Sequence, residues 1–220
     1  MLYLFDSEHL RFVDQRQVYT QRVGCIEWNG QLITTGSRDG VIRSFDMRSR
    51  SQPCSKGGHG HALEVCGLRW DPSGKVLASG GNDNKIFLWD AREEIPVCSL
   101  IGHHGAVKAL AWSPHDPTLL ATGGGTADRC IKFWNTKTNI LTNSIDTRSQ
   151  VCNLHWSTTD KELLSTHGFS SNAINLWTYP NMDQLISLKG HSQRVVYFVF
   201  PFLITERFTW RRKHCYWLIR

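Results

Sequence analysis

Two series of aromatic residues recur along this chain at a nearly constant interval. The first runs at intervals of 42, 42 and 44 residues through Trp28, Trp70, Trp112 and Trp156. The second runs at intervals of 44, 45 and 43 residues through Phe45, Trp89, Trp134 and Trp177. A repeated unit of about 40 to 45 residues with a tryptophan near its end is typical of propeller blades. Such a unit cannot bury both faces of its sheet alone, so its fold depends on neighbouring units.

The pattern inside each unit predicts short β-strands. In one unit, three strands are expected at residues 65–70, 76–79 and 85–89, separated by turns rich in Pro, Gly, Asn and Asp. The other units repeat this order at residues 23–28, 32–35 and 41–45, at 107–112, 119–122 and 131–134, and at 151–156, 162–165 and 173–177. Short strands at this spacing predict an all-β fold, and the period identifies it as a WD40 β-propeller.

The repeat divides the chain into a propeller region and a tail. Residues 1–200 form the partial propeller, with four complete blades expected near 12–55, 56–98, 99–144 and 145–188 and the start of another at 189–200. Residues 2–6 are expected to end a preceding blade, and residues 12–15 to open the next one. The apolar and basic tail at 201–220 departs from the pattern. Because a propeller avoids exposed sheet edges by closing its ring, we expect this chain to be a fragment, a truncated splice form or a misread gene product.

Histidines and aspartates near the ends of the predicted strands favour a structural role. In three units a histidine precedes the first valine by four residues, as His61 precedes Val65. Because buried polar groups must be paired, we expect two buried hydrogen-bonded networks, one in each of two blades. Their members are His61, Ser79, Asp83 and Trp89, and His103, Thr122, Asp128 and Trp134.

The same residue types give little support to catalysis or to metal binding. Cys54, His59 and His61 lack a fourth ligand at a recognisable spacing for zinc. The glycines at 123–125 lack the Lys-Ser/Thr of a phosphate-binding loop, and no nucleophile stands beside a base. We therefore expect no enzymatic activity, no metal and no cofactor.

The net charge and the cysteines indicate which binding partners and which cellular location to expect. The formal net charge is +6, but residues 201–220 carry five Lys or Arg residues against one acid, so the propeller region is nearly neutral. This distribution does not favour a nucleic-acid partner, although binding through the basic stretch at 211–214 stays an alternative. The seven cysteines include no C-x-x-C pair, which suits reduced thiols. With neither a signal peptide nor a membrane-spanning stretch indicated, we expect a protein of the nucleus and cytoplasm with no membrane partner.

Several loop strings resemble one family closely. They are Glu64-Val-Cys-Gly-Leu-Arg-Trp70, Leu77-Ala-Ser-Gly-Gly-Asn-Asp-Asn84, Ala106-Val-Lys-Ala-Leu-Ala-Trp112, Gly123-Gly-Gly-Thr-Ala-Asp-Arg-Cys130, Ser149-Gln-Val-Cys152, Ser165-Thr-His-Gly168 and Gly190-His-Ser-Gln-Arg194. They resemble the Fizzy/Fizzy-related family of WD-repeat coactivators of the anaphase-promoting complex, a ubiquitin ligase. The strings at 126–130 and 165–168 resemble the Fizzy-related branch. The resemblance covers residues 2–198 and includes loop residues that the fold itself does not demand.

The resemblance implies a seven-bladed ring, of which this chain carries the end of the second blade, the third to sixth blades and the start of the seventh. It implies a substrate-recognition coactivator that binds the Lys-Glu-Asn box (KEN box), a short degron, on one face of the ring. The matching positions are Asn82, Asn84, Thr126, Gln150 and Arg194. Arg194 is suited to the Glu of the motif, and the amides to its Lys and Asn. For residues 82–84 the alternative is a tight turn.

The resemblance also implies partners, which are subunits of the anaphase-promoting complex and degron-bearing substrates and inhibitors such as cyclin-like proteins. The family's C-box segment and first blade have no match here, and its seventh blade is incomplete. We therefore expect no groove for the destruction box and only a partial ABBA-type groove. The terminal Ile219 and Arg220 match a family dipeptide that docks on the ligase, but the preceding tail favours coincidence. Two alternatives are a generic WD-repeat interaction scaffold and a non-functional truncated fragment.

Overall fold

The computed structural model describes residues 2–6, 9, 11–16, 19–48 and 58–197 and is built of β-strands joined by turns. Among these residues there is no helix long and apolar enough to cross a membrane. Cys54 and the tail at 201–220, with Ile219 and Arg220, lie outside the described residues.

Four four-stranded antiparallel sheets make up most of the described chain. The first contains β3 (Val23–Asn29), β4 (Leu32–Ser37), β5 (Val41–Asp46) and β6 (Gly58–His59). The second contains β7 (Val65–Trp70), β8 (Val76–Gly81), β9 (Lys85–Asp90) and β10 (Cys98–Ile101). The third contains β11 (Val107–Trp112), β12 (Leu119–Gly124), β13 (Cys130–Asn135) and β14 (Ile140–Asp146). The fourth contains β15 (Val151–Trp156), β16 (Glu162–His167), β17 (Ile174–Thr178) and β18 (Gln184–Leu188).

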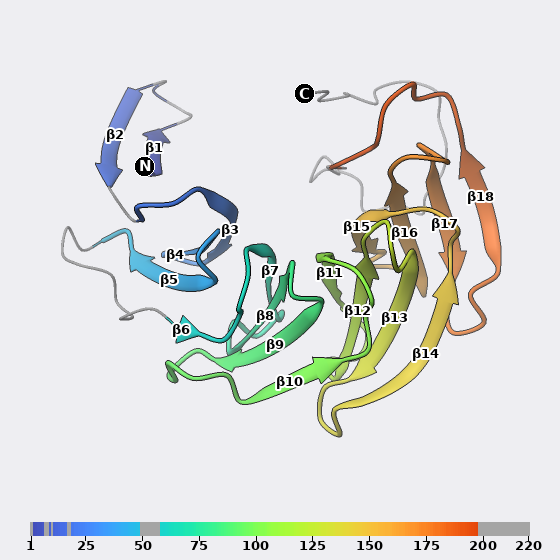
Figure 1. The fold of residues 1–220 in the computed structure, drawn as a ribbon, viewed down its shortest axis with the longest axis horizontal. Coiled ribbons are helices and arrows are strands. Elements are labelled where there is room, and N and C mark those ends of the chain that lie inside the picture. The colour runs from blue at the N-terminus through green and yellow to red at the C-terminus, as the bar shows by residue number, and fades with distance from the viewer. Residues whose placement is uncertain (1, 7–8, 10, 17–18, 49–57, 198–220) are drawn as a thin grey trace.

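The sheets stand side by side in an arc, with their first strands on its inner side (Figure 1). Strand β3 lies against β7, β7 against β11, and β11 against β15. This arrangement confirms the all-β prediction, and the inner three strands of each sheet agree with the predicted strands to within one or two residues.

The apolar core lies between neighbouring sheets. Phe133 of the third sheet and Trp156 of the fourth belong to one buried cluster. Leu100 of the second sheet and Leu120 of the third belong to another. Neighbouring sheets therefore share their apolar cores, as expected for a repeat unit that cannot bury both faces alone.

The structure corrects the prediction for residues 12–15. They lie in β2 (Arg11–Arg16), which pairs antiparallel with β1 (Leu2–Asp6), and they do not open the sheet that follows. The short connection between the two segments favours such a hairpin. The hairpin packs on the first sheet through Leu2, which shares a buried cluster with Ile33 and Phe45.

At the other end, the expected start of a further blade contains no strand up to residue 197. Val195 instead packs against Leu164 and Ile174 of the fourth sheet, and its N–H donates to the carbonyl of His167 at 3.1 Å. Residues 198–200 of this predicted segment lie outside the described residues.

Candidate functional site

The five predicted degron-binding residues lie at the same end of the sheets. Val65 at the start of β7 pairs with Gly81 at the end of β8, so the segment entering β7 and the β8–β9 loop meet at one end. The third and fourth sheets repeat this register. We call this end, formed by the β4–β5, β8–β9, β12–β13 and β16–β17 loops and by the segments entering β3, β7, β11 and β15, the upper face. It carries Asn82, Asn84, Thr126 and Gln150. Arg194 lies at the same end, because the N–H of the next residue, Val195, donates to the carbonyl of His167 at the end of β16.

A buried hydrogen-bonded network supports the upper face of the second sheet. The Trp89 Nε1–H donates to Ser79 Oγ at 2.8 Å, and Ser79 Oγ lies 2.8 Å from His61 Nε2. His61 Nδ1 lies 2.9 Å from Asp83 Oδ1. Burial lowers the pKa of His61, so the ring is neutral near pH 7 and donates Nδ1–H to Asp83. In this network each group donates one hydrogen bond to the next, in the order Trp89, Ser79, His61 and Asp83.

The third sheet holds the same network with threonine in place of serine. The Trp134 Nε1–H donates to Thr122 Oγ1 at 2.9 Å, and Thr122 Oγ1 lies 2.7 Å from His103 Nε2. His103 Nδ1 lies 2.6 Å from Asp128 Oδ2, and the N–H of His104 donates to Asp128 Oδ1 at 3.0 Å. These bonds hold the β12–β13 loop against the segment entering β11. The predicted members of both networks therefore lie together.

The other two sheets reach a related arrangement with residues that the sequence pattern missed. In the fourth sheet, Trp177 donates to Ser165 Oγ at 2.7 Å. The same oxygen lies 2.7 Å from Nε2 of His167, which belongs to the same strand, β16. In the first sheet Phe45 replaces the tryptophan, and the Tyr19 hydroxyl lies 3.1 Å from Thr35 Oγ1 and donates to the carbonyl of Thr35. His167 lies in the family-like string at 165–168, and that string is the sequence feature from which its place in the network could have been predicted.

The predicted site residues differ in what they contact. Thr126 Oγ1 donates to Gln150 Oε1 at 3.5 Å, so these two lie together. Asn82 Oδ1 accepts a bond from Cys66 Sγ at 3.1 Å. Asn84 has a φ of 64° and its N–H donates to the carbonyl of Gly81 at 3.2 Å, as the tight-turn interpretation predicts for this residue. No hydrogen bond joins Asn82 or Asn84 to the other three in the described part of the chain.

Arg194 is held by an aromatic neighbour that the sequence pattern did not single out. Its guanidinium carbon lies 5.6 Å from the ring centre of Phe169 in the β16–β17 loop. Both side chains are exposed on the upper face, with Phe169 58% exposed. Such a cation–π contact restricts the guanidinium without neutralising its charge. In the described part of the chain no carboxylate pairs with Arg194, so its oriented guanidinium can pair with a carboxylate of a ligand.

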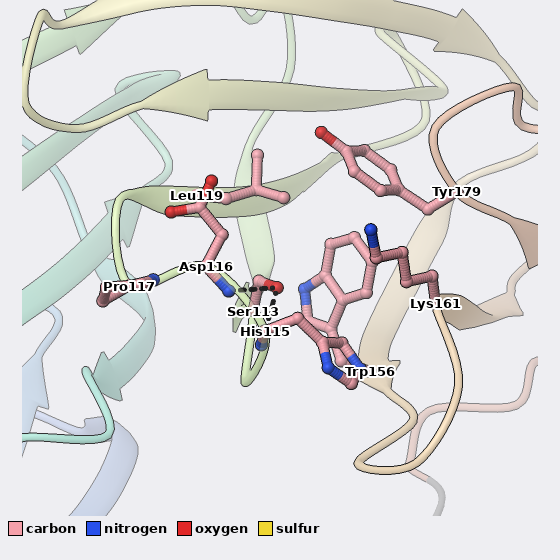
Figure 2. A pocket seen from close by; sticks show the side chains of 8 residues that line it. All are labelled: Ser113, His115, Asp116, Pro117, Leu119, Trp156, Lys161 and Tyr179. Carbon is pink, nitrogen blue, oxygen red and sulfur yellow. Dashed lines mark hydrogen bonds between the residues drawn. The ribbon is translucent and has the colours of Figure 1, made fainter.

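A separate hollow lies at the opposite, lower end of the sheets (Figure 2). It has a volume of about 320 Å³ and is lined by Ser113, His115, Asp116, Pro117, Leu119, Trp156, Lys161 and Tyr179. His115 Nε2 lies 3.0 Å from the carbonyls of Ser157 and Asp160, so this loop joins the third and fourth sheets. None of the five predicted site residues contributes to this hollow.

Comparison with known proteins identifies the relatives of this chain. The CDC20/Fizzy WD40 domain matches residues 1–201. Protein FIZZY-RELATED 1 of Arabidopsis thaliana is 53% identical over 176 residues, which cover 80% of this chain and 37% of the relative. Cell division cycle 20.1, cofactor of APC complex, of the same plant is 50% identical over 185 residues, covering 81% of this chain and 40% of the relative. The meiotic fizzy-related protein 1 of Schizosaccharomyces pombe is 43% identical over 197 residues, covering 90% and 47%.

The fold agrees with these relationships. A chain in the crystal structure of a mitotic checkpoint complex superposes with a TM-score of 0.85 at 42% identity, covering 89% of this chain and 60% of that chain. Together with the family match, this likeness confirms the WD40 prediction. The chain spans about two fifths of the length of the Arabidopsis relatives named above.

Proposed function

Because this chain belongs to the CDC20/Fizzy family of WD40 proteins, we propose that it recognises substrates of the anaphase-promoting complex by binding the Lys-Glu-Asn degron on its upper face. The role is that of a non-catalytic adaptor, in which ubiquitin transfer belongs to the ligase. The relatives that support it include a protein named as a cofactor of that complex.

The observation that carries the proposal is the position of Arg194. This exposed guanidinium is oriented by Phe169 and lies at the same end of the sheets as Gln150, Thr126 and Asn82. A peptide with Lys, Glu and Asn side chains needs one cation for its carboxylate and amide or hydroxyl groups for its other two side chains. The buried networks hold the loops that carry Asn82 and Thr126, which reduces the ordering that ligand binding requires.

The proposed partners are degron-bearing substrates and inhibitors and the subunits of the ligase. The similar chain of known structure was crystallised within a mitotic checkpoint complex, and this supports a checkpoint protein as one of the partners. A single short motif buries little surface, so micromolar affinity per motif is expected, with avidity from several motifs. We place this function in the nucleus and cytoplasm.

Arg194→Ala tests the proposal directly. We expect it to weaken binding of a fluorescein-labelled Lys-Glu-Asn peptide by about tenfold or more, because the charge-assisted bond to the glutamate is lost. Fluorescence anisotropy with the 220-residue chain measures the effect. Arg92→Ala removes an exposed arginine from the β9–β10 loop at the lower face and serves as the matched control. Equal binding by wild type and Arg194→Ala would refute the assigned site, and failure of the wild type to bind would favour a generic WD-repeat scaffold.

A further inference from the structure

A second hollow on the upper face adjoins the proposed degron site. It has a volume of about 390 Å³ and lies between the first and second sheets. Its lining residues are Arg22, Arg38, Leu63, Glu64 and Asn82. Since Asn82 belongs both to this hollow and to the proposed site, a peptide bound at Asn82 has a direct path into the hollow.

One residue of the hollow occupies, in the first sheet, the position that a residue of the proposed site occupies in the second sheet. The Arg38 N–H donates to the carbonyl of Arg22 at 2.9 Å, just as the Asn82 N–H donates to that of Glu64 at 2.9 Å. Arg38 therefore holds in the first sheet the position that Asn82 holds in the second. Equivalent positions of successive repeats face the same surface, so Arg38 extends the row of ligand-facing positions.

Close packing of two loops fixes the place of Arg38. Gly40 in the β4–β5 loop has a φ of +81°, and a Cβ there would lie 2.2 Å from the carbonyl oxygen of His61. The loop that carries Arg38 thus abuts the segment that carries Leu63 and Glu64. This contact builds the wall of the hollow from two blades.

The charges in the hollow leave one cation uncompensated. The Arg22 guanidinium is committed to Glu64, with Nη2 2.8 Å from both carboxylate oxygens and Nε 3.1 Å from one of them. Within the described ranges, no side-chain partner of Arg38 is found. Leu63 beside it is 53% exposed. The hollow therefore presents a free guanidinium next to an apolar side chain, with a neutralised ion pair on its wall.

We propose that this hollow is a subsite for an acidic residue that flanks the degron. The Arg38 guanidinium pairs with the flanking carboxylate in the fork geometry that arginine favours, and the aliphatic part of the same residue packs on Leu63. The subsite selects degrons with acidic flanks over those with basic flanks, because a lysine there meets Arg38 as a like charge. This inference rests on the proposed degron function, of which it specifies the substrate class.

The test compares labelled peptides on the 220-residue chain by fluorescence anisotropy. One peptide contains the Lys-Glu-Asn core with alanine flanks, two carry three glutamates on the N-terminal or C-terminal side, and two carry lysines there. We expect one glutamate peptide to bind wild type about fivefold more tightly than the core peptide, which is the upper range for a partly exposed ion pair. In Arg38→Glu that gain disappears and the matching lysine peptide gains instead, while the core peptide binds both proteins equally. Raising the salt to about 0.5 M reduces the gain.

Arg92→Glu reverses the charge of an arginine at the lower face and is the matched control, which should keep the gain. If the core peptide binds but neither glutamate peptide distinguishes wild type from Arg38→Glu, the subsite is refuted and the degron function stands. An equal loss of the gain in Arg92→Glu also refutes it, because the effect is then one of overall charge. If no peptide binds the wild type, both the degron function and the subsite are refuted.

Discussion

At the scale of single residues, the hydrogen-bonded networks depend on groups that both donate and accept. Ser79 Oγ receives the Trp89 N–H and lies beside His61 Nε2, so it links an indole to an imidazole inside the second sheet. The first sheet has no indole at this position, since Phe45 replaces it, and Tyr19 supplies a hydroxyl to Thr35 instead. At this position in each sheet, the buried hydroxyl of Ser or Thr must make its hydrogen bonds, but different neighbours can supply the partner.

Trp89→Phe removes one donor from this network. We expect the free energy of unfolding to fall by about 1 to 3 kcal/mol, because the indole hydrogen bond and some buried volume are both lost. Urea denaturation measures the change, and the loss should be less than additive with Ser79→Ala, since both variants break the same bond. Trp28→Phe is the matched control, because Trp28 is 53% exposed and should change stability little. A cost as large for Trp28 as for Trp89 would contradict the role of the network.

His167 links stability to pH. The residue is fully buried, and burial lowers its pKa from 6.5 to about 4. Between these values the unfolded chain binds a proton that the folded chain does not, so stability is fully present above about pH 6.5 and declines as the pH falls towards about 4. His167 alone should contribute a loss of about 3 kcal/mol over this range. The pKa values of His61 and His103 are lowered by burial too, so these residues act in the same direction.

Urea denaturation across the range from neutral pH to about pH 4 checks this linkage. His167→Gln should be less stable than wild type at neutral pH but should lose less stability on acidification. A slope unchanged in His167→Gln would show that other groups cause the acid sensitivity.

At the scale of strands and loops, glycines set the distance between neighbouring sheets. A Cβ on Gly67 in β7 would lie 2.2 Å from the backbone oxygen of Lys108 in β11. That contact involves backbone and not a movable side chain, so an added methyl group must push two inner strands apart. The close approach of β7 to β11 therefore depends on this residue.

Gly67→Ala should lower the free energy of unfolding by about 3 kcal/mol, at the upper end of the usual cost of overpacking. Thermal or urea denaturation of the 220-residue chain measures it. Gly105→Ala is the matched control, because its added methyl would lie 3.2 Å from the nearest neighbouring atom, the Asp128 nitrogen, and should be tolerated far better. Equal costs for the two variants would show that the contact between β7 and β11 relaxes freely.

The inner strands were predictable from the sequence, but the outer strands were not. Strands such as β11 and β12 are largely buried and carry the repeated Val, Trp and small residues, so their pattern is regular. The outermost strands β14 and β18 are almost entirely exposed, and exposed strands need no fixed apolar alternation. Their identity depends on pairing with β13 and β17, which no local sequence pattern records.

The candidate site was predictable only where it follows the repeat. His61 and His103 precede their strands at a fixed distance, which located the networks, whereas His167 reaches the same place from inside β16. Phe169 and Arg38 have no motif of their own. Phe169 matters through its contact with Arg194, and Arg38 through its place beside Leu63, and both depend on loops that meet only in the folded chain.

At the scale of the whole molecule, the third sheet is packed on both of its faces, and every residue of its strand β12 is buried. Alternate residues of β12 face different neighbours, since Leu120 belongs to the cluster shared with the second sheet and Ala121 to the cluster shared with the fourth. The β1–β2 hairpin, by contrast, leaves Tyr3, Phe5 and Phe12 exposed. A sheet packed on both sides opens only when its neighbours lose contacts too, so amide exchange should be slowest in β12 and β13 and fastest in β1 and β2.

Phe133→Ala tests whether the sheets act as one cooperative unit. Phe133 is fully buried between the third and fourth sheets, where its ring lies 6.1 Å from that of Trp156 and 5.4 Å from that of Tyr179. Removing it should cost about 3 to 5 kcal/mol, because the cavity has rigid aromatic walls. Since those walls belong to the next sheet, hydrogen exchange followed by mass spectrometry should show faster exchange in β15–β17 as well as in β12 and β13. Acceleration confined to the third sheet would mean that each blade unfolds on its own, and the upper face would then lack the rigidity that the proposed degron site requires.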